Sequence, residues 1–154
     1  MMNHDFVSNA SADTPSAGRG FDRRCEGETA SSRYRITPEI LDHFFAAFHD
    51  SNPLHRDTAY ASSKGFKDRV AYGAVLNGFI SHFIGVVFPG QSSLLQSVDI
   101  QYKSPCYSGD EIEIQSRVFQ VSPATHTISL KLKLRNKTQQ NLCASAKAQV
   151  GILE

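Results

Sequence analysis

The sequence predicts one α+β domain in which a long buried helix packs against an antiparallel sheet. Residues 71–88 are apolar and long enough to form a buried helix. Several later segments alternate apolar and polar residues, which is the period of a strand with one buried face. The chain has 154 residues, the usual size of a single domain, so we expect helix and sheet to form two layers of one fold.

The first elements are a short strand and an amphipathic helix. The strand is expected over residues 28–36. Thr37 then suits a helix N-cap, and Pro38 suits the first helical position. The apolar residues that recur at helical spacing after it are Ile40, Phe44, Phe45 and Phe48. This helix is expected to end near His49, because the Asn-Pro pair that follows disfavours helical backbone.

Three shorter segments lead to the long helix. Residues 50–56 are expected to form a polar loop, and residues 57–64 a short helix capped by Asp57. Residues 65–69 form a basic connector. The long helix is expected over residues 73–88, where a Pro-Gly pair stops it.

The remainder of the chain predicts strands separated by turns. The clearest alternating runs are residues 98–102, 112–121, 128–134 and 144–152. Together with the first strand they give a sheet of about five strands. Because the long helix is apolar nearly all round, one sheet alone does not cover it, and we expect a homodimer.

Composition excludes several classes of function. The formal net charge is +1, which argues against a nucleic-acid-binding protein. The three cysteines (Cys25, Cys106 and Cys143) are far apart, which argues against a disulfide scaffold and favours a reducing, cytoplasmic compartment. Polar residues and glycines interrupt the apolar run at 71–88, so a buried helix explains it better than a membrane span.

The first 27 residues differ in composition from the rest of the chain. They are rich in small and polar residues and lack the continuous apolar run of a secretory signal. Such a segment buries too little apolar surface to offset the entropy of ordering. We therefore expect a flexible tail over residues 1–27 and a folded domain over residues 28–154.

The candidate chemistry lies in the loop after the first helix. Asp50 and His55 are a carboxylate and an imidazole within six residues, and both types act as proton carriers. Pro53 stiffens the loop between them, and Asn52 can hydrogen-bond a neighbouring group or a bound water. Taken alone, an Asp before Asn-Pro is more often a turn residue.

A second candidate lies at the start of the long helix. The free N–H groups and the dipole of a helix N-terminus favour negative charge, and Gly73 would let a carbonyl oxygen approach closely. That is the geometry of an oxyanion hole. The candidate substrate contacts are Tyr72, just before this glycine, Asn77, one helical turn after it, and Asn52 in the loop, although for Asn77 a dimer contact or close helix packing also fits.

Residues 48–80 resemble the hydratase motif of the MaoC-like family of (R)-specific enoyl-CoA hydratases. The family pattern is roughly G-D-x-N-P-x-H, then about a dozen residues, then A-H-G before the central helix. This chain has His49-Asp50-Ser51-Asn52-Pro53-Leu54-His55 and then Ala71-Tyr72-Gly73. The later Tyr102-Lys103-Ser104-Pro105 and Gly109-Asp110 are similar to the strand and turn that follow. The likeness covers about residues 33–152.

The resemblance implies a hot-dog fold, in which a curved antiparallel sheet wraps around the long helix, and a homodimer. It implies hydration of trans-2-enoyl thioesters, or dehydration of (R)-3-hydroxyacyl thioesters, in fatty acid metabolism. Asp50 and His55 would match the catalytic pair, and the Gly73 N–H would polarise the thioester carbonyl. The acyl group would be carried by coenzyme A or by the phosphopantetheine of an acyl carrier protein, and no metal or redox cofactor is needed.

Two residues depart from the family pattern, and two other functions stay open. His49 replaces the usual glycine and Tyr72 the usual histidine, which puts the shape of the pocket in doubt. The alternatives are a hot-dog thioesterase and a non-catalytic module that binds acyl thioesters. A metal site built from His43, His49, Asp50 and His55 is disfavoured, because it leaves the Asn-Pro pair unexplained.

Overall fold

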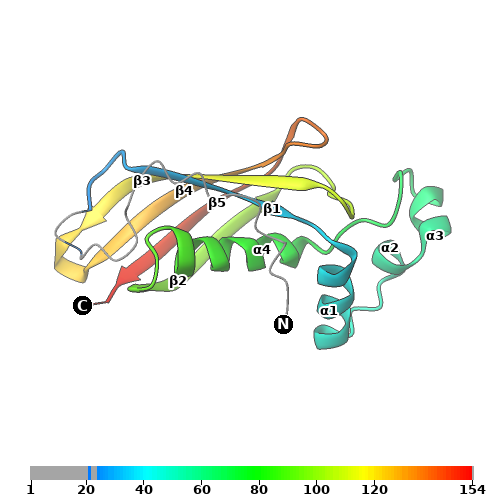
Figure 1. The fold of residues 1–154 in the computed structure, drawn as a ribbon, viewed down its shortest axis with the longest axis horizontal. Coiled ribbons are helices and arrows are strands. Elements are labelled where there is room, and N and C mark those ends of the chain that lie inside the picture. The colour runs from blue at the N-terminus through cyan, green and yellow to red at the C-terminus, as the bar shows by residue number, and fades with distance from the viewer. Residues whose placement is uncertain (1–20, 22–23, 154) are drawn as a thin grey trace.

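The computed structural model describes residue 21 and residues 24–153 of the chain. A five-stranded antiparallel sheet curves around one central helix, α4 (Figure 1). The strands are β1 (Thr29–Arg35), β2 (Ser93–Tyr102), β3 (Glu111–Ser122), β4 (Thr127–Asn136) and β5 (Asn141–Ile152). Their order in the sheet is β1-β3-β4-β5-β2, so β1 and β2 form the two edges. This is the hot-dog arrangement, and it confirms the predicted fold class.

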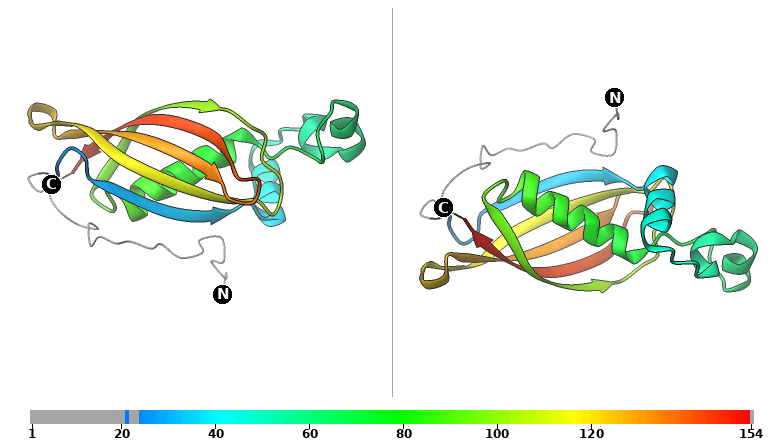
Figure 2. Two further views of the ribbon diagram at one scale, coloured as in Figure 1. Left: turned by 90° about the horizontal axis from the view of Figure 1, so that it is seen from above. Right: turned by 90° about the horizontal axis from the view of Figure 1, so that it is seen from below.

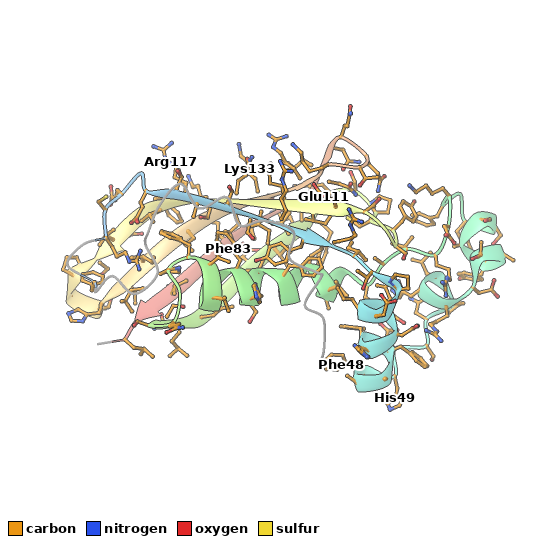
Figure 3. All side chains as sticks on the ribbon, viewed as in Figure 1. Phe48, His49, Phe83, Glu111, Arg117 and Lys133 are labelled. Carbon is orange, nitrogen blue, oxygen red and sulfur yellow. The ribbon has the colours of Figure 1, made fainter. Side chains whose placement is uncertain are left out.

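The alternating runs place one face of the sheet in the core. In β4, Ile128, Leu130, Leu132 and Leu134 are fully or almost fully buried. The residues between them on the outer face include Lys131, Lys133 and Arg135, which are exposed. Figure 3 shows Lys133, Arg117 and Glu111 on this outer side and Phe83 between sheet and helix. Period-two patterning therefore predicts which side of each strand the helix covers.

The central helix lies across the concave face of the sheet (Figure 2). It comprises α4 (Gly73–His82) and a π-helical turn, η2 (Phe83–Val87), before Phe88 and Pro89. The residues that face the core are Val75, Leu76, Phe79, Ile80, Phe83 and Ile84.

The prediction that this helix is apolar nearly all round is wrong. Its exposed positions include Ala74, Asn77, Gly78 and Ser81, which are small or polar. The sequence does not reveal this exposed face, because Ala and Gly occur both in cores and on surfaces and so leave an apolar run almost unbroken. The outward face of α4 is therefore mainly small or polar, whereas Val86 of η2 and Leu94 of the edge strand β2 are large apolar side chains that are more than half exposed.

Three short helices gather at the end of the molecule where α4 begins (Figure 1). They are α1 (Pro38–Phe48), α2 (Pro53–Arg56) and α3 (Thr58–Ser63). Both predicted caps are confirmed: the side chain of Thr37 accepts from the Ile40 N–H, and that of Asp57 accepts from the Tyr60 N–H. The prediction of an irregular loop over residues 50–56 misses α2, a single turn that starts at the proline.

The rest of the domain covers only part of the apolar face of α1. None of its residues is fully buried; Phe44 and Phe45 pack on the edge of the core, whereas Phe48 is 69% exposed. Because α1 stands at the end of the sheet, only one side of its apolar stripe meets the domain. Among the described residues, no helix is long and apolar enough to cross a membrane.

The described part of the predicted tail packs on the domain. Phe21 and Arg24 are buried, and the guanidinium of Arg24 donates to the Pro89 carbonyl at 3.0 Å. The same guanidinium lies over the Phe88 ring, 5.3 Å from its centroid. An aromatic ring and a hydrogen-bonded cation thus hold Phe21 and Arg24 on the domain, whereas the flexible tail over residues 1–27 stays a prediction. The expectation for residues 1–20 and 22–23 lies outside the described residues.

A buried tyrosine makes the stability of the fold sensitive to alkaline pH. Tyr34 is fully buried, and its hydroxyl hydrogen-bonds to His82 Nδ1 at 3.2 Å. Burial raises the pKa of Tyr34 to about 12, although the nearby Ser32 hydroxyl opposes the shift. The folded chain therefore holds this proton in a range where the unfolded chain, with a pKa of about 10, has lost it.

We expect the contribution of Tyr34 to the free energy of unfolding to be complete below pH 10 and to disappear between about pH 10 and 12. The loss should amount to about 3 kcal/mol. Urea unfolding at a series of pH values measures it. A Tyr34→Phe variant has no phenol to ionise, so its stability should fall less over this range; equal losses in both proteins would contradict the prediction.

Candidate active site

The loop that carries the predicted site begins with a left-handed residue. His49 ends α1 with φ 52°, and its N–H donates to the Phe45 carbonyl at 2.8 Å. Glycine adopts this backbone conformation at the lowest cost, which explains a glycine at this point of the family pattern. The His49 ring meets the Phe45 ring edge-on, with centroids 6.1 Å apart, at the free end of α1 (Figure 3). It therefore departs from the pattern without crowding the loop.

Two side chains of the loop bond to backbone two residues ahead. Asp50 Oδ1 accepts from the Asn52 N–H at 3.1 Å, and Asn52 Oδ1 accepts from the Leu54 N–H at 3.0 Å. Such Asx turns pre-form the backbone of the loop. Asn52 is thus the N-cap of α2, the turn that carries His55. Both Asp50 and Asn52 are exposed.

The structure fixes which nitrogen of His55 is free. His55 Nδ1 lies 2.7 Å from the Val70 carbonyl oxygen, and the Val70 N–H donates to the Leu54 carbonyl at 3.1 Å. A carbonyl oxygen only accepts, so Nδ1 must carry a proton and donate it. In the neutral ring, Nε2 then holds the lone pair. His55 is therefore set to exchange a proton through Nε2.

A cavity of about 300 Å³ lies beside these groups. Its lining residues are His55, Phe66, Val70, Ala71, Tyr72, Gly73, Leu76, Tyr102, Lys103, Ser104, Pro105 and Cys106. Three predicted site residues, His55, Tyr72 and Gly73, thus meet at one cavity. Asp50 is outside the lining, but its carbonyl accepts a hydrogen bond from the Tyr72 hydroxyl at 3.2 Å. The backbone of Asp50 therefore lies directly behind the cavity wall.

The start of α4 offers free backbone donors. Tyr72 occupies the N-cap position and its side chain makes no hydrogen bond to the first turn. The N–H of Gly73 therefore has no capping partner in the described residues, and the helix dipole adds positive potential there. The Tyr102 ring lies against this glycine, since a Cβ at position 73 would be 3.0 Å from Tyr102 Cζ. Only a glycine fits this approach without moving the ring.

Two predicted positions take other roles. Asn52 caps α2, as described above, and Asn77 lies on the exposed side of α4. Asn77 instead hydrogen-bonds to Tyr102, which partly offsets the rise in the pKa of the Tyr102 hydroxyl that burial causes. Neither asparagine lines the cavity, so their predicted contact with substrate stays a prediction.

Sequence reasoning missed the wall formed by residues 102–106. Tyr102 and the turn after it reach the cavity because β2 pairs with β5 and because the Ala71 N–H donates to the Cys106 carbonyl at 2.7 Å. Neither contact is local in sequence. The one available signal was the segment Tyr102-Lys103-Ser104-Pro105, which resembles the family pattern. It marks the end of a strand but does not show that this end lies beside the start of α4.

The cavity holds a cysteine that is poorly suited to nucleophilic chemistry. Cys106 is buried, and the pKa of its thiol is raised. The largest cause is a hydrogen bond with Cys143, and burial is the second. A protonated thiol is a weak nucleophile. Within the described residues, no group of three or more His, Cys, Asp or Glu side chains is arranged to hold a metal ion.

Comparison with known proteins points to one family. A family model described as "MaoC like domain" matches residues 25–140. The chain is 32% identical over 87 residues to an (R)-specific enoyl-CoA hydratase of Rhodospirillum rubrum, covering 56% of this chain and 60% of that protein. It is 39% identical over 77 residues to a mitochondrial 3-hydroxyacyl-[acyl-carrier-protein] dehydratase of Arabidopsis thaliana, covering 50% of this chain and 45% of that protein. The match thus spans about half to three-fifths of these relatives.

The fold has a close match among solved structures. The R-hydratase PhaJ1 of Pseudomonas aeruginosa, in its unliganded form, superposes with a TM-score of 0.80 at 24% sequence identity. The superposition covers 88% of this chain and 86% of that chain. The two chains therefore share the fold.

Proposed function

Because this chain belongs to the MaoC-like domain family, we propose that it is a lyase that interconverts trans-2-enoyl and (R)-3-hydroxyacyl thioesters by adding or removing water. The observation that carries the proposal is a cavity lined both by His55, whose Nδ1 bonds to the Val70 carbonyl, and by Gly73, the first residue of α4. The printed names of the relatives, a hydratase and a dehydratase, support the same reaction class.

In the hydration direction, Asp50 acts as the general base. Its carboxylate takes a proton from water as the hydroxide bonds to C3 of the enoyl group. His55 in its protonated form gives a proton from Nε2 to C2, because Nδ1 is held by the Val70 carbonyl. In the dehydration direction the two residues exchange these roles. His55 and Asp50 thus hold one water between a base and an acid.

Gly73 stabilises the charge that develops on the thioester oxygen. As C3 is attacked, electron density moves to the carbonyl and forms an enolate. The Gly73 N–H and the positive end of the α4 dipole favour that negative charge. The scheme calls for no redox cofactor, since the addition of water changes no oxidation state overall, and it calls for no metal ion, since the Gly73 N–H takes the role of stabilising the oxygen charge.

The carrier of the acyl group is coenzyme A or the phosphopantetheine of an acyl carrier protein. Lys103 lines the cavity, and Lys67 Nζ lies 4.3 Å from the centroid of the Tyr107 ring, next to the lining residue Cys106. Cations at this edge suit the phosphate that both carriers share. We further propose a cytoplasmic homodimer in fatty acid metabolism that pairs through β2, where Leu94 and Tyr102 are about half exposed.

The proposal is tested with crotonyl-CoA and a longer trans-2-enoyl-CoA, by loss of the enoyl absorbance and by chiral analysis of the product. We expect an (R)-3-hydroxyacyl product. Release of free thiol instead would indicate the thioesterase alternative. Binding of the thioester without turnover would indicate a non-catalytic module, and either result would overturn the proposal.

Asp50→Asn is expected to lower kcat about 100-fold, because the amide cannot take a proton from water. The substitution keeps Oδ1, so the turn to Asn52 should survive. Circular dichroism and the unfolding temperature check that the variant folds. Activity within a factor of three of the wild type would remove Asp50 from the mechanism.

Gly73→Ala is expected to lower kcat/KM about 10- to 100-fold, because the new methyl group forces the Tyr102 ring to move and obstructs the approach to the N–H. Gly78→Ala is the matched control, since a Cβ at Gly78 meets nothing within 4 Å. That variant should keep activity and gain about 0.5–1 kcal/mol of stability from helix propensity. Equal effects of the two substitutions on activity would contradict a special role for Gly73.

A further inference from the structure

We propose that Tyr72 is a positioning residue, which fixes the His55 ring and the Asp50 backbone relative to each other and to the start of α4. This inference rests on the proposed function and gives Tyr72 a role besides the predicted contact with substrate. In the family pattern this position is a histidine, so the device belongs to this chain rather than to the pattern.

Tyr72 contacts both halves of the proposed acid–base pair. Its hydroxyl donates to the Asp50 carbonyl at 3.2 Å, and its ring centroid lies 4.4 Å from that of His55. The ring also stacks on Phe44 of α1, with centroids 4.5 Å apart and planes 28° apart. Tyr72 is only 3% exposed, so packing holds it in one place.

These contacts add a link at the Asp50 end of the loop, since the His55 end is already bonded to the segment before α4. The Asp50 side chain bonds to the Asn52 N–H within its own exposed loop, and His55 is tied to Val70. The Tyr72 hydroxyl links the Asp50 end of the loop to the cavity wall. Tyr72 is the N-cap of α4, and Gly73 is the next residue along the chain, so the position of the Gly73 N–H depends on the position of Tyr72. One side chain therefore sets the distance from the proton carriers to the oxyanion donor.

The hydroxyl and the ring make separable contributions. The hydroxyl holds Asp50, whereas the ring covers one side of the His55 imidazole and limits its rotation. A residue that positions catalytic groups changes kcat with little effect on KM, and a residue that binds the substrate equally in ground and transition states changes KM. Displacement of catalytic groups by about 1 Å costs up to about 100-fold in rate.

The kinetic test compares Tyr72→Phe and Tyr72→Leu in the full chain, with crotonyl-CoA as substrate. We expect kcat to fall about fivefold for Tyr72→Phe, the value of one hydrogen bond, and about 100-fold for Tyr72→Leu. KM should stay within twofold in both. Tyr60→Phe is the matched control, because Tyr60 is a partly exposed tyrosine of α3 outside the cavity lining, and it should change neither parameter. A rise in KM at constant kcat, or no change in either parameter, would overturn the proposal.

A second readout needs no turnover and separates this proposal from the proposed function. Nitrogen-15 NMR of the histidine rings reports which nitrogen of neutral His55 is protonated. The wild type and Tyr72→Phe should show a proton on Nδ1. In Tyr72→Leu the imidazole is free to rotate away from the Val70 carbonyl, so we expect a mixture of tautomers and faster hydrogen exchange at the Asn52 and His55 amides. If the wild type fails to hydrate thioesters but these changes occur, the positioning role stands and the reaction does not. Unchanged spectra and exchange in Tyr72→Leu would refute the positioning role.

Discussion

His55→Asn is expected to lower kcat/KM about 1,000-fold while the domain stays folded, since removal of a positioned acid–base group costs about 10²- to 10⁴-fold. The asparagine side chain offers an N–H in place of Nδ1, so the bond to the Val70 carbonyl has a donor. It offers nothing in place of Nε2. The variant therefore removes the proton carrier and keeps its anchor.

His55→Ala separates the two roles of His55, which are proton transfer through Nε2 and the hydrogen bond from Nδ1 to the Val70 carbonyl. It removes both nitrogens and leaves the Val70 carbonyl without this donor, so we expect the same loss of activity and also a lower unfolding temperature. Steady-state kinetics with crotonyl-CoA and thermal unfolding of both variants measure the difference. If His55→Asn kept most of the wild-type activity, proton transfer through Nε2 would be wrong, whereas inactivity of both variants with unequal stability is the expected pattern.

The parts of the fold that were predicted correctly depend on local patterns. The N-caps Thr37 and Asp57 follow from hydrogen bonds that span three residues. The strands follow from period-two alternation, which is set by the pleat. Gly73 was placed at a helix start because helix signals also lie close together in sequence.

The parts that were missed depend on contacts between distant segments. Tyr102 and Cys106 reach the cavity through the β2–β5 pairing and the bond from Ala71, and a single sequence does not reveal register. The bond from the Tyr72 hydroxyl to the Asp50 carbonyl also joins distant segments and was not predicted, whereas the predicted contact of Tyr72 with substrate stays a prediction. The outward face of α4 was misjudged because glycine and alanine fit both a core and a surface.

The turn that completes the cavity wall is held by one buried carboxylate, and its loss should have the largest effect on stability. Asp110 is 2% exposed, and its Oδ2 accepts from the Tyr107 N–H at 2.8 Å, from Asn136 Nδ2 at 2.7 Å and from Gln139 Nε2 at 2.6 Å. Asp110→Ala leaves these donors without that acceptor. At about 1–3 kcal/mol for each unsatisfied buried group, partly relieved by water, we expect a loss of about 4 kcal/mol.

Urea unfolding of Asp110→Ala and of the control Asp42→Ala measures this loss. The Asp42 side chain is 74% exposed on α1 and makes a surface ion pair with Arg56, so its removal should cost less than about 1 kcal/mol. A cost below about 1 kcal/mol for Asp110→Ala would show that the three donors find other acceptors. Gln139 Nε2 also donates to the Pro105 carbonyl at 3.2 Å, so the same network fixes the turn that lines the cavity. Asp110→Ala should therefore lose activity at temperatures where it is still folded. Loss of activity before loss of the folded state would show that Asp110, which takes no part in the proposed reaction, sets the shape of the cavity.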